Sequence, residues 1–455
     1  MSGAELALTN ALLGQLGAKR HRNAMRAAYY DGRNAIEDFG VSIPPAFRNV
    51  AVVLGWPAKA VDILNRRCVF EQFHSSGVDL ASSGVEQAFA DNRMARELPQ
   101  VGVSSLVHSV AWLITTRGDV EAGEPKALIT ARDALTGTGE WDFRRRRLSS
   151  FLSVMATRDG EPSQVALHIP GQVITATRGR SGWSSERQRT GSDRVMVHPY
   201  VYRPNLGRPF GASRISRAVM SLTNSALRTV VRSEVSAEFY SSPQRYLLGA
   251  DKQAFTDASG NVQNQWQAIL GRVWAVQKDE DGDTPTVGQF PQSSQQPHMD
   301  QLKAWAQLFA GETSIPISSL GISSDANPTS AEAYLASRED LITEAEGTTD
   351  GWGVALEGVA ADVAEVMNDG PVDMSGVTAA WRDVRFTSRA AAADAGAKIA
   401  AVVPGLADTE VGLELLGLSP DQIRRFLAER RVAAGRGVLE GLRAQVAAPD
   451  VVAAQ

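Results

Sequence analysis

Apolar residues recur at helical spacing near the start of the chain. Leu13 and Leu16 lie three residues apart, and Leu6 and Met25 continue the same pattern. Such spacing places apolar side chains on one face and is typical of an amphipathic helix. The pattern predicts helix over most of residues 1–40, a second helix over 56–70, and one or two further helices between 81 and 114.

The middle of the chain is predicted to form an antiparallel sheet. Short β-like runs are separated there by Gly, Asp and Pro, which mark turns between strands. The runs are Ala111–Thr115, Lys126–Thr130, Leu148–Met155, Gln164–Ile169, Gln172–Ala176 and Arg194–Tyr202. The connection 178–193 is rich in Arg, Ser and Gly and is expected to be a mobile loop.

Helical spacing returns after Gly211. An apolar stripe from Ile215 to Phe239 spans about seven turns, and Ser213 is a candidate for its cap. A compact α/β stretch is predicted to follow, and then a helix over residues 299–310 with Trp305 on its apolar face. The elements predicted for the compact stretch are strands at 246–248, 273–276 and 286–290, a helix at 264–270 and an acidic turn at 279–283.

Two later helices begin with a capping box, in which the cap and the third helical residue bond each other's backbone. Thr329 and Glu332 form one, and we expect that helix to reach about Glu346. Ser419 and Gln422 form the other, with Pro420 at the favoured first position. The Ala-rich C-terminal region is therefore predicted to be helical.

The composition is that of a globular chain. Its 455 residues are 43% hydrophobic and 21% charged, which is enough material for several cores. No apolar run reaches the roughly 18 residues of a transmembrane helix, and the first residues lack a secretory-signal pattern. Cys68 is the only cysteine, which excludes intrachain disulfides and multi-cysteine metal sites. These features favour a reducing cytoplasm, or a particle assembled there.

The net charge of −5 hides an uneven distribution. Residues 141–232 contain sixteen Arg, no Lys and five acids, whereas residues 331–370 contain ten acids and one base. This asymmetry indicates that different segments meet different surfaces, with nucleic acid as one candidate. Arg outnumbers Lys by 39 to 7 over the whole chain, however, so coding bias explains part of the pattern.

Motifs for catalysis are missing from the sequence. There is no phosphate-binding loop, no dinucleotide fingerprint, no zinc-protease helix and no nucleophile elbow. The six histidines are scattered. The acidic run at 279–283 would need a Glu where Phe290 stands to be a calcium loop, so a solvated turn is the better interpretation. We therefore assign no catalytic, cofactor-binding or metal residue.

Two charged features remain as candidate sites. The densest basic run could contact phosphates, or it could be an exposed turn whose charges discourage edge pairing; it consists of Arg144, Arg145, Arg146 and Arg147. Glu332, Glu339 and Glu346 are spaced by seven and share one helix face. That face is either simply solvated or a wall that repels anions.

Four ordered blocks of sequence carry a family resemblance. They are Tyr29-Tyr30-Asp31-Gly32 with Asn49-Val50 and the helix from Trp56; Phe210-Gly211-Ala212-Ser213-Arg214-Ile215 with the helix ending at Phe239–Arg245; Trp266–Trp274 with Gly288-Gln289-Phe290; and Ala310–Thr313 with Ile315-Pro316, Leu320-Gly321 and Asn327–Ala333. In this order they resemble the portal (head-to-tail connector) proteins of tailed bacteriophages, particularly the siphophage type of actinobacterial phages. The resemblance covers roughly residues 20–430.

The resemblance implies an α+β portal fold in a ring-forming subunit. The ring would typically have twelve subunits around a channel for double-stranded DNA. By position, the implied parts are a mixed α/β wing (1–211), a stem helix (212–242), a small α/β clip (243–298), a second stem helix (299–313), a tunnel loop (314–328), a channel helix with the rest of the wing (329–395), and an α-helical crown with the C-terminal tail (396–455).

Site residues follow from the same resemblance. The tunnel loop would approach DNA through Ser319, Gly321, Ser323, Ser324, Asp325 and Asn327. Glu332, Glu339 and Glu346 would form an acidic channel face, to which DNA does not adhere because the ring multiplies the charge.

The implied role is structural and not enzymatic, without a cofactor and without a membrane. The resemblance implies a location in the virion at the portal vertex, after assembly in the host cytoplasm. The implied partners are further copies of the chain, the terminase large subunit, the head-tail adaptor, and the major capsid and scaffolding proteins. Two alternatives stay open: another head component such as a minor capsid protein, or a nucleic-acid-processing packaging enzyme. Only the Arg-rich middle supports the enzyme.

Overall fold

The computed structural model describes residues 1–34, 52–75, 77, 79–180, 182–240, 245–248, 286–289, 294–322, 338–385 and 389–447. Its helices are α1 (Gly3–Tyr30), α2 (Trp56–Asn65), α3 (Leu80–Ser83), α4 (Val85–Asp91), α5 (Met94–His108), α6 (Arg217–Tyr240), α8 (Gln296–Thr313), α10 (Glu339–Met367), α11 (Arg389–Val402), α12 (Glu410–Leu415) and α13 (Pro420–Ala447), with short 3-10 turns η3 (Ile317–Leu320) and η4 (Leu406–Asp408). Its strands are β1 (Phe70–Ser75), β2 (Val110–Arg117), β3 (Ala127–Asp133), β4 (Gly137–Asp142), β5 (Arg147–Arg158), β6 (Glu161–Ile169), β7 (Gln172–Gly179), β8 (Gly182–Arg189), β9 (Val197–Val201), β10 (Arg245–Leu248), β11 (Thr286–Gln289) and β12 (Val377–Trp381).

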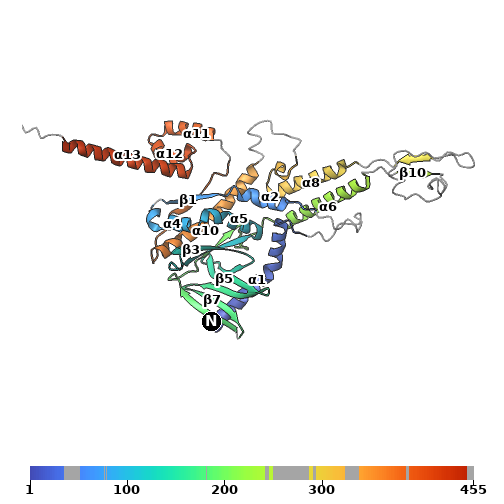
Figure 1. Cartoon of the computed structure of the whole chain (residues 1–455), viewed down its shortest axis with the longest axis horizontal. Coiled ribbons are helices and arrows are strands. Elements are labelled where there is room, and N and C mark those ends of the chain that lie inside the picture. The colour runs from blue at the N-terminus through green and yellow to red at the C-terminus, as the bar shows by residue number, and fades with distance from the viewer. Residues whose placement is uncertain are drawn as a thin grey trace, which may run out of the picture.

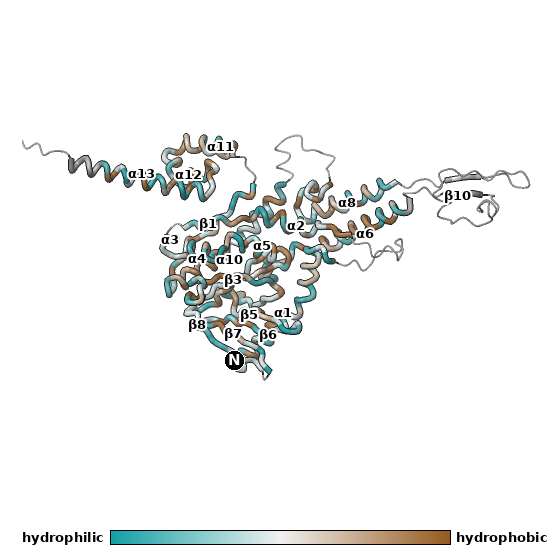
Figure 2. Tube along the Cα trace, in the orientation of Figure 1, coloured by the Kyte–Doolittle hydropathy of each residue, from teal (hydrophilic) through white to brown (hydrophobic). Residues whose placement is uncertain are grey.

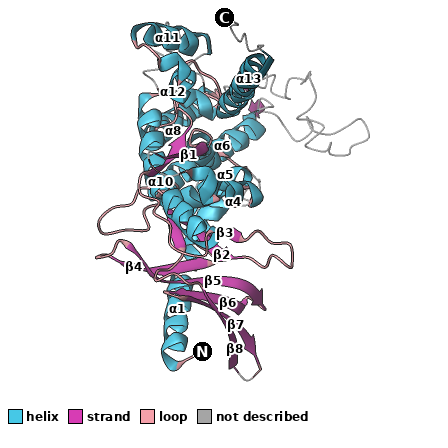
Figure 3. Cartoon of the chain, turned by 90° about the vertical axis from the view of Figure 1, so that its left-hand side faces the viewer, coloured by secondary structure: helices cyan, strands magenta, loops and turns pink. Residues whose placement is uncertain are grey.

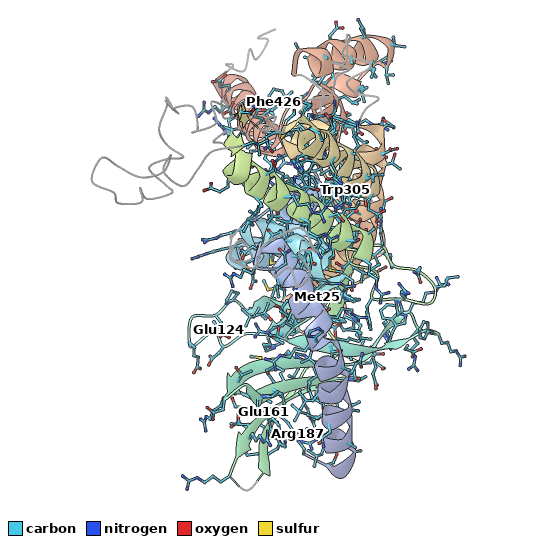
Figure 4. The ribbon with its side chains drawn as sticks, turned by 90° about the vertical axis from the view of Figure 1, so that its right-hand side faces the viewer. Met25, Glu124, Glu161, Arg187, Trp305 and Phe426 are labelled. Carbon is cyan, nitrogen blue, oxygen red and sulfur yellow. The ribbon has the colours of Figure 1, made fainter. Side chains whose placement is uncertain are left out.

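A mixed α/β body holds the first half of the chain together with α10 and β12 (Figure 1). Its sheets are a five-stranded antiparallel meander in the order β4-β5-β6-β7-β8, a three-stranded sheet β3-β2-β9, and the pair β1-β12. The strands are runs rich in apolar and β-branched residues that lie between turns marked by Gly, Asp and Pro. The meander lies at the end of the body furthest from α11, α12 and α13 (Figures 3 and 4).

The helix α10 crosses the centre of the body. Leu356, Val359 and Val363 on it are fully buried, and Trp352 stacks on Tyr200 with ring centroids 4.5 Å apart. β12 then pairs with β1, joining Ala379 to Phe73 across about three hundred residues of sequence. The body core is thus completed by a segment that follows α6 and α8 in the chain.

Two long helices project from the body as an antiparallel pair, which we call the stem. α6 and α8 pack along their length, and Trp305 donates from its indole nitrogen to Thr229 Oγ1 at 3.2 Å. At the far end, Gln295 bonds Ser233 at 3.0 Å and Ser236 at 3.3 Å. The antiparallel pair β10-β11 lies beyond that end (Figure 1).

The C-terminal helices form a separate small unit beside the body (Figures 1 and 2). Leu413 and Ile423 are buried where α12 packs on α11 and α13. The Ser419 box is confirmed: Gln422 N donates to Ser419 Oγ at 3.4 Å, and Ser419 N donates to Gln422 Oε1 at 2.9 Å. Side chains from Ala428 to Glu440 on α13 are all exposed.

Several sequence predictions are confirmed with shifted ends. The first helix ends at Tyr30, and each of the six predicted β runs overlaps an observed strand. The strands predicted at 246–248 and 286–290 are β10 and β11. The predicted elements at 264–270, 273–276 and 279–283, and the capping box at Thr329, lie outside the described residues.

Other predictions were wrong. The connection 178–193 is not a loop, because β8 pairs with β7 through a turn in which Gly182 has φ 122°. The second helix stops at Asn65 instead of residue 70, since Phe70 begins β1 and pairs with Trp381. The helix expected to end near Glu346 continues to Met367 because tertiary packing buries its later turns. α6 starts at Arg217, and Ser216, not Ser213, accepts from the first turn through Val219 N at 3.1 Å.

We predict that Trp352→Ala lowers the free energy of unfolding by about 3–5 kcal/mol, because it leaves a large cavity in the body core. Val354→Ala is the matched control: Val354 lies on the same helix but is 69% exposed, so its effect should stay within about 0.5 kcal/mol. Denaturant unfolding of both variants tests this, and similar losses in the two would contradict the assignment of α10 as the core helix.

Candidate stem junction and channel surface

A buried arginine lies where the stem joins the body. Arg214 precedes α6 and is only 5% exposed. Its guanidinium donates to the backbone oxygens of Ala60 at 2.6 Å and Thr313 at 2.5 Å. It also donates to the Tyr202 hydroxyl at 2.9 Å. One side chain therefore joins α2, the residue after β9 and the end of α8 at the start of α6.

Glu344 on α10 supplies the counter-charge. Its Oε1 lies 2.6 Å from the guanidinium of Arg214 and 2.6 Å from that of Arg203, and it accepts the Tyr202 hydroxyl. Burial is the largest single influence and would raise the pKa of Glu344, but the charge and hydrogen bond of Arg214, the hydrogen bond from Tyr202 and the charge of Arg203 together outweigh it, so the pKa is lowered. Burial raises the pKa of Tyr202 to about 12. The junction thus holds a guanidinium, a carboxylate and a neutral phenol at neutral pH.

The predicted tunnel loop starts at this junction. A shallow pocket there is lined by Arg203, Ser314, Asp340, Thr343, Glu344 and Thr348. Ser319 lies in η3, and its carbonyl oxygen accepts from Lys59 Nζ at 2.8 Å. Gly321 ends η3 with φ 80°, a left-handed conformation that suits glycine.

The first residues of the loop are held against the body. Ile315 and Leu320 are buried, at 3% and 6% exposed. Residues 314–322 of the predicted tunnel loop therefore cannot move without exposing buried apolar side chains. Ser323, Ser324, Asp325 and Asn327 lie outside the described residues, so their role stays a prediction.

The predicted acidic face is partly described. Glu339 and Glu346 are exposed on α10, and Glu346 lies 3.4 Å from the Arg385 guanidinium. Glu332 lies outside the described residues. Glu344 lies two residues before Glu346 on the same helix but turns inward to Arg214, because the ion pair there offsets the cost of burying its charge. Orientation of Glu339 and Glu346 toward a channel stays a prediction.

The basic run lies in the hairpin between β4 and β5. Arg144, Arg145 and Arg146 are exposed in its turn, and Arg147 begins β5. Asp142 Oδ1 accepts the backbone N–H groups of Arg144 and Arg145 at 2.9 and 3.0 Å, which fixes the turn. The exposed-turn interpretation of this run is thus the one that the structure supports, and phosphate contact stays a hypothesis.

A second buried ionic network holds the other half of α10. Asp362 has no exposed surface and accepts from Arg194 at 2.9 and 2.7 Å, while His198 Nε2 lies 2.8 Å from its second oxygen. A Cβ on Gly358 would lie 2.3 Å from His198 Nδ1, so only glycine fits there. The sequence analysis missed both networks. Arg214 inside an otherwise apolar block was the one available signal.

Reactive groups are few in the described part of the chain. It holds no cluster of three or more His, Cys, Asp or Glu side chains that could bind a metal ion. Burial raises the pKa of the Cys68 thiol to about 12, so it is protonated. Among the described helices, none has the length and apolarity to cross a bilayer.

A family comparison decides what this architecture belongs to. The family model described as phage portal protein, SPP1 Gp6-like, matches residues 13–435. The chain belongs to this portal protein family. The match includes the body, the stem, residues 314–322 and most of the C-terminal helices. The resemblance seen in the sequence is therefore confirmed.

Named portal proteins are similar over nearly the whole length. The portal protein of Mycobacterium phage L5 is 26% identical over 427 residues, covering 91% of this chain and 87% of that protein. The portal protein of Mycobacterium phage D29 is 27% identical, covering 90% and 86%. A chain from the neck of a native GTA particle, computed with C12 symmetry, aligns with 80% of this chain and 90% of its own length at 13% identity and a TM-score of 0.44.

We predict that Glu344→Ala destabilises this portal protein by about 3–5 kcal/mol, because it leaves the Arg214 charge buried without a partner. Glu346→Ala is the matched control on the same helix. Its ion pair with Arg385 is exposed on both sides, and such pairs contribute about 0–1 kcal/mol. Urea unfolding at neutral pH measures both effects.

Acid titration separates the ion pair from simple packing. Because the pKa of Glu344 is lowered in the folded protein, its contribution is fully present above the ordinary value of 4.5 and is lost as the pH falls through the folded-state value. The wild type should therefore lose more stability than Glu344→Gln between about pH 5 and pH 3. Parallel loss in the two proteins would show that the charge of Glu344 is unimportant.

Proposed function

We propose that the chain forms a closed ring of twelve subunits at one vertex of the capsid. The ring conducts double-stranded DNA during packaging and ejection, and serves as a docking platform for the terminase and the head-tail adaptor. The family match across residues 13–435 carries this proposal, because a portal ring around a DNA channel is the role of the family.

Unpartnered surface on the stem supports association between copies. Met299 and Leu308 on α8 are 55% and 56% exposed, and Gly311 leaves the same helix open to close approach. Apolar side chains of this size are costly in water and suit an interface. Met299 and Leu308 lie nine residues apart and therefore on opposite sides of α8, so in the ring each would be covered by the stem of a different neighbouring subunit.

The domain assignment is proposed in the same terms. The body corresponds to the wing, α6 and α8 to the stem, and the segment around β10 and β11 to the clip. Residues 314–328 form the tunnel loop, Glu339 and Glu346 line the channel, and α11 to α13 form the crown. The packing of α6 on α8 supports the stem, whose second helix begins at Gln296, three residues before the boundary expected from sequence.

Partners and setting complete the proposal. As a portal protein the chain is a structural virion component, and we propose that it has no ATPase or nuclease activity of its own. Energy for packaging then comes from a separate terminase. Assembly in the host cytoplasm, with contacts to the major capsid and scaffolding proteins, fits the same role.

The ring is tested directly by negative-stain imaging with light scattering after size exclusion. We expect rings with a central hole and a mass near twelve chains, formed without nucleotide or metal. A stable monomer across micromolar concentrations would contradict the proposal, as would ATP hydrolysis that co-purifies with the chain and is lost in a point variant of it.

The acidic channel face is tested by reversing its charge. Rings with Glu332, Glu339 and Glu346 replaced by Lys should bind duplex DNA in a salt-sensitive way, because added cations release phosphate counterions. Rings with Glu86, Glu121 and Glu186 replaced by Lys carry the same charge change on the exposed surface of the body. DNA binding at two salt concentrations distinguishes the two, and equal binding would show that α10 faces away from the channel.

A further inference from the structure

An aromatic groove lies beside the β4–β5 hairpin, away from the stem junction. Its lining includes Gln15, Trp141, Phe143, Ser149, Pro209 and Phe210. The ring of Phe210 packs between the rings of Trp112 and Trp141, with centroid distances of 5.1 Å and 6.0 Å. These aromatic side chains hold one another in place and form a rigid floor. β4 itself is an edge strand of the five-stranded sheet.

The groove is bordered by apolar side chains that water surrounds. Phe143 is 65% exposed at the tip of the hairpin, and Leu206, in the connection that also supplies Pro209, is 99% exposed. Neither contributes to a core cluster. Exposed large apolar residues next to a rigid concave floor are typical of protein interaction sites.

One rim of the groove is positive. Arg144, Arg145 and Arg146 follow Phe143 in the turn, and all three are exposed. The guanidinium of Arg145 forms an ion pair with Asp142, whose carboxylate oxygen lies 3.7 Å away. Glu140 also lines the groove, where it accepts from Ser150 Oγ at 3.2 Å. These two acids offset part of the charge, but no carboxylate among the described residues pairs with Arg144 or Arg146, so the rim keeps a net positive charge.

The other rim is α1, which packs against β4 and β5. Gln15 lines the groove, and Lys19, Arg22 and Arg26 continue the same helix face at spacings of four, three and four. No carboxylate in the described part of the chain forms an ion pair with these three. Burial and then the charge of Arg22 lower the pKa of Lys19, and the same two causes lower that of Arg26 to about 10. Arg26 is half-buried and donates to the His108 carbonyl oxygen at 3.5 Å, so the cations that the helix presents beside the groove are Lys19 and the exposed Arg22.

We propose that this groove binds an acidic segment of another protein, with one large apolar side chain seated against Phe143, Trp141 and Phe210. Carboxylates on either side of that anchor would pair with the two basic rims. A nucleic-acid backbone would satisfy the cations but has no need of an apolar seat, and the exposed aromatic residues favour the protein. None of the described residues assigned to the proposed DNA channel lines this groove.

The probe is a display library of short random peptides, selected on the full-length protein. Enriched peptides should combine several Asp or Glu residues with a Trp, Phe or Leu. Synthetic copies should bind at least about tenfold more weakly to Phe143→Ser and to the triple variant Arg144→Ala, Arg145→Ala, Arg146→Ala. All four replaced side chains are exposed, so the fold should be retained. Fluorescence anisotropy gives the affinities, and circular dichroism checks folding.

A matched control uses the same sheet. Arg158, Arg178 and Arg180 are also exposed arginines, and replacing all three by Ala should leave peptide affinity unchanged. The proposal is overturned if no peptide is enriched, if the enriched peptides lack acidic or apolar residues, or if both triple variants weaken binding equally. It is also overturned if duplex DNA displaces the peptide from the wild type and itself binds the hairpin variants less tightly than the wild type. The groove would then be a nucleic-acid site.

Discussion

The ion pair between Arg214 and Glu344 is the interaction on which the architecture depends. A guanidinium taken out of water is tolerable only if nearly all its donors are used, and here they reach Glu344, Tyr202 and the carbonyls of Ala60 and Thr313. Those groups belong to elements spread over most of the sequence. Their geometry fixes where α6 leaves the body, where α8 returns to it and where α10 crosses it.

Because α6 begins and α8 ends at this junction, the stem and residues 314–322 share one mechanical base. Ile315 and Leu320 are buried directly after α8, and Lys59 from α2 donates to the carbonyl oxygen of Ser319. In the proposed ring, where residues 314–328 would be the tunnel loop, force on that loop would reach the stem and α10 through packed side chains. A buried ionic junction suits this role better than an apolar one, because its directional bonds allow one arrangement where apolar contacts allow several.

Charge is divided among three places with different consequences. The junction and the network around Asp362 neutralise their charges inside the body. The exposed acids of α10 keep theirs, as the proposed DNA channel would require. The cations of α1 and the β4–β5 hairpin are only partly offset by acids beside an aromatic groove. The Arg-rich middle of the sequence therefore supplies a buried strut, Arg214, as well as an outward-facing surface, and a count of charges along the chain cannot separate them.

The sequence by itself determined the local elements and the family. Apolar spacing located α1, α6 and α8, turn residues located most of the strands, and the block around Gly211–Ile215 pointed to a portal protein. Only the tertiary structure decided which charges are buried: Glu344 and Glu346 are two residues apart on α10, yet one faces Arg214 and the other faces solvent. Tertiary contacts also pair β8 with β7 within the segment 178–193 and extend α10 to Met367. Local periodicity reports which face of a segment is apolar. It does not report what distant segment will cover that face, because burial is set by contacts between residues far apart in the chain.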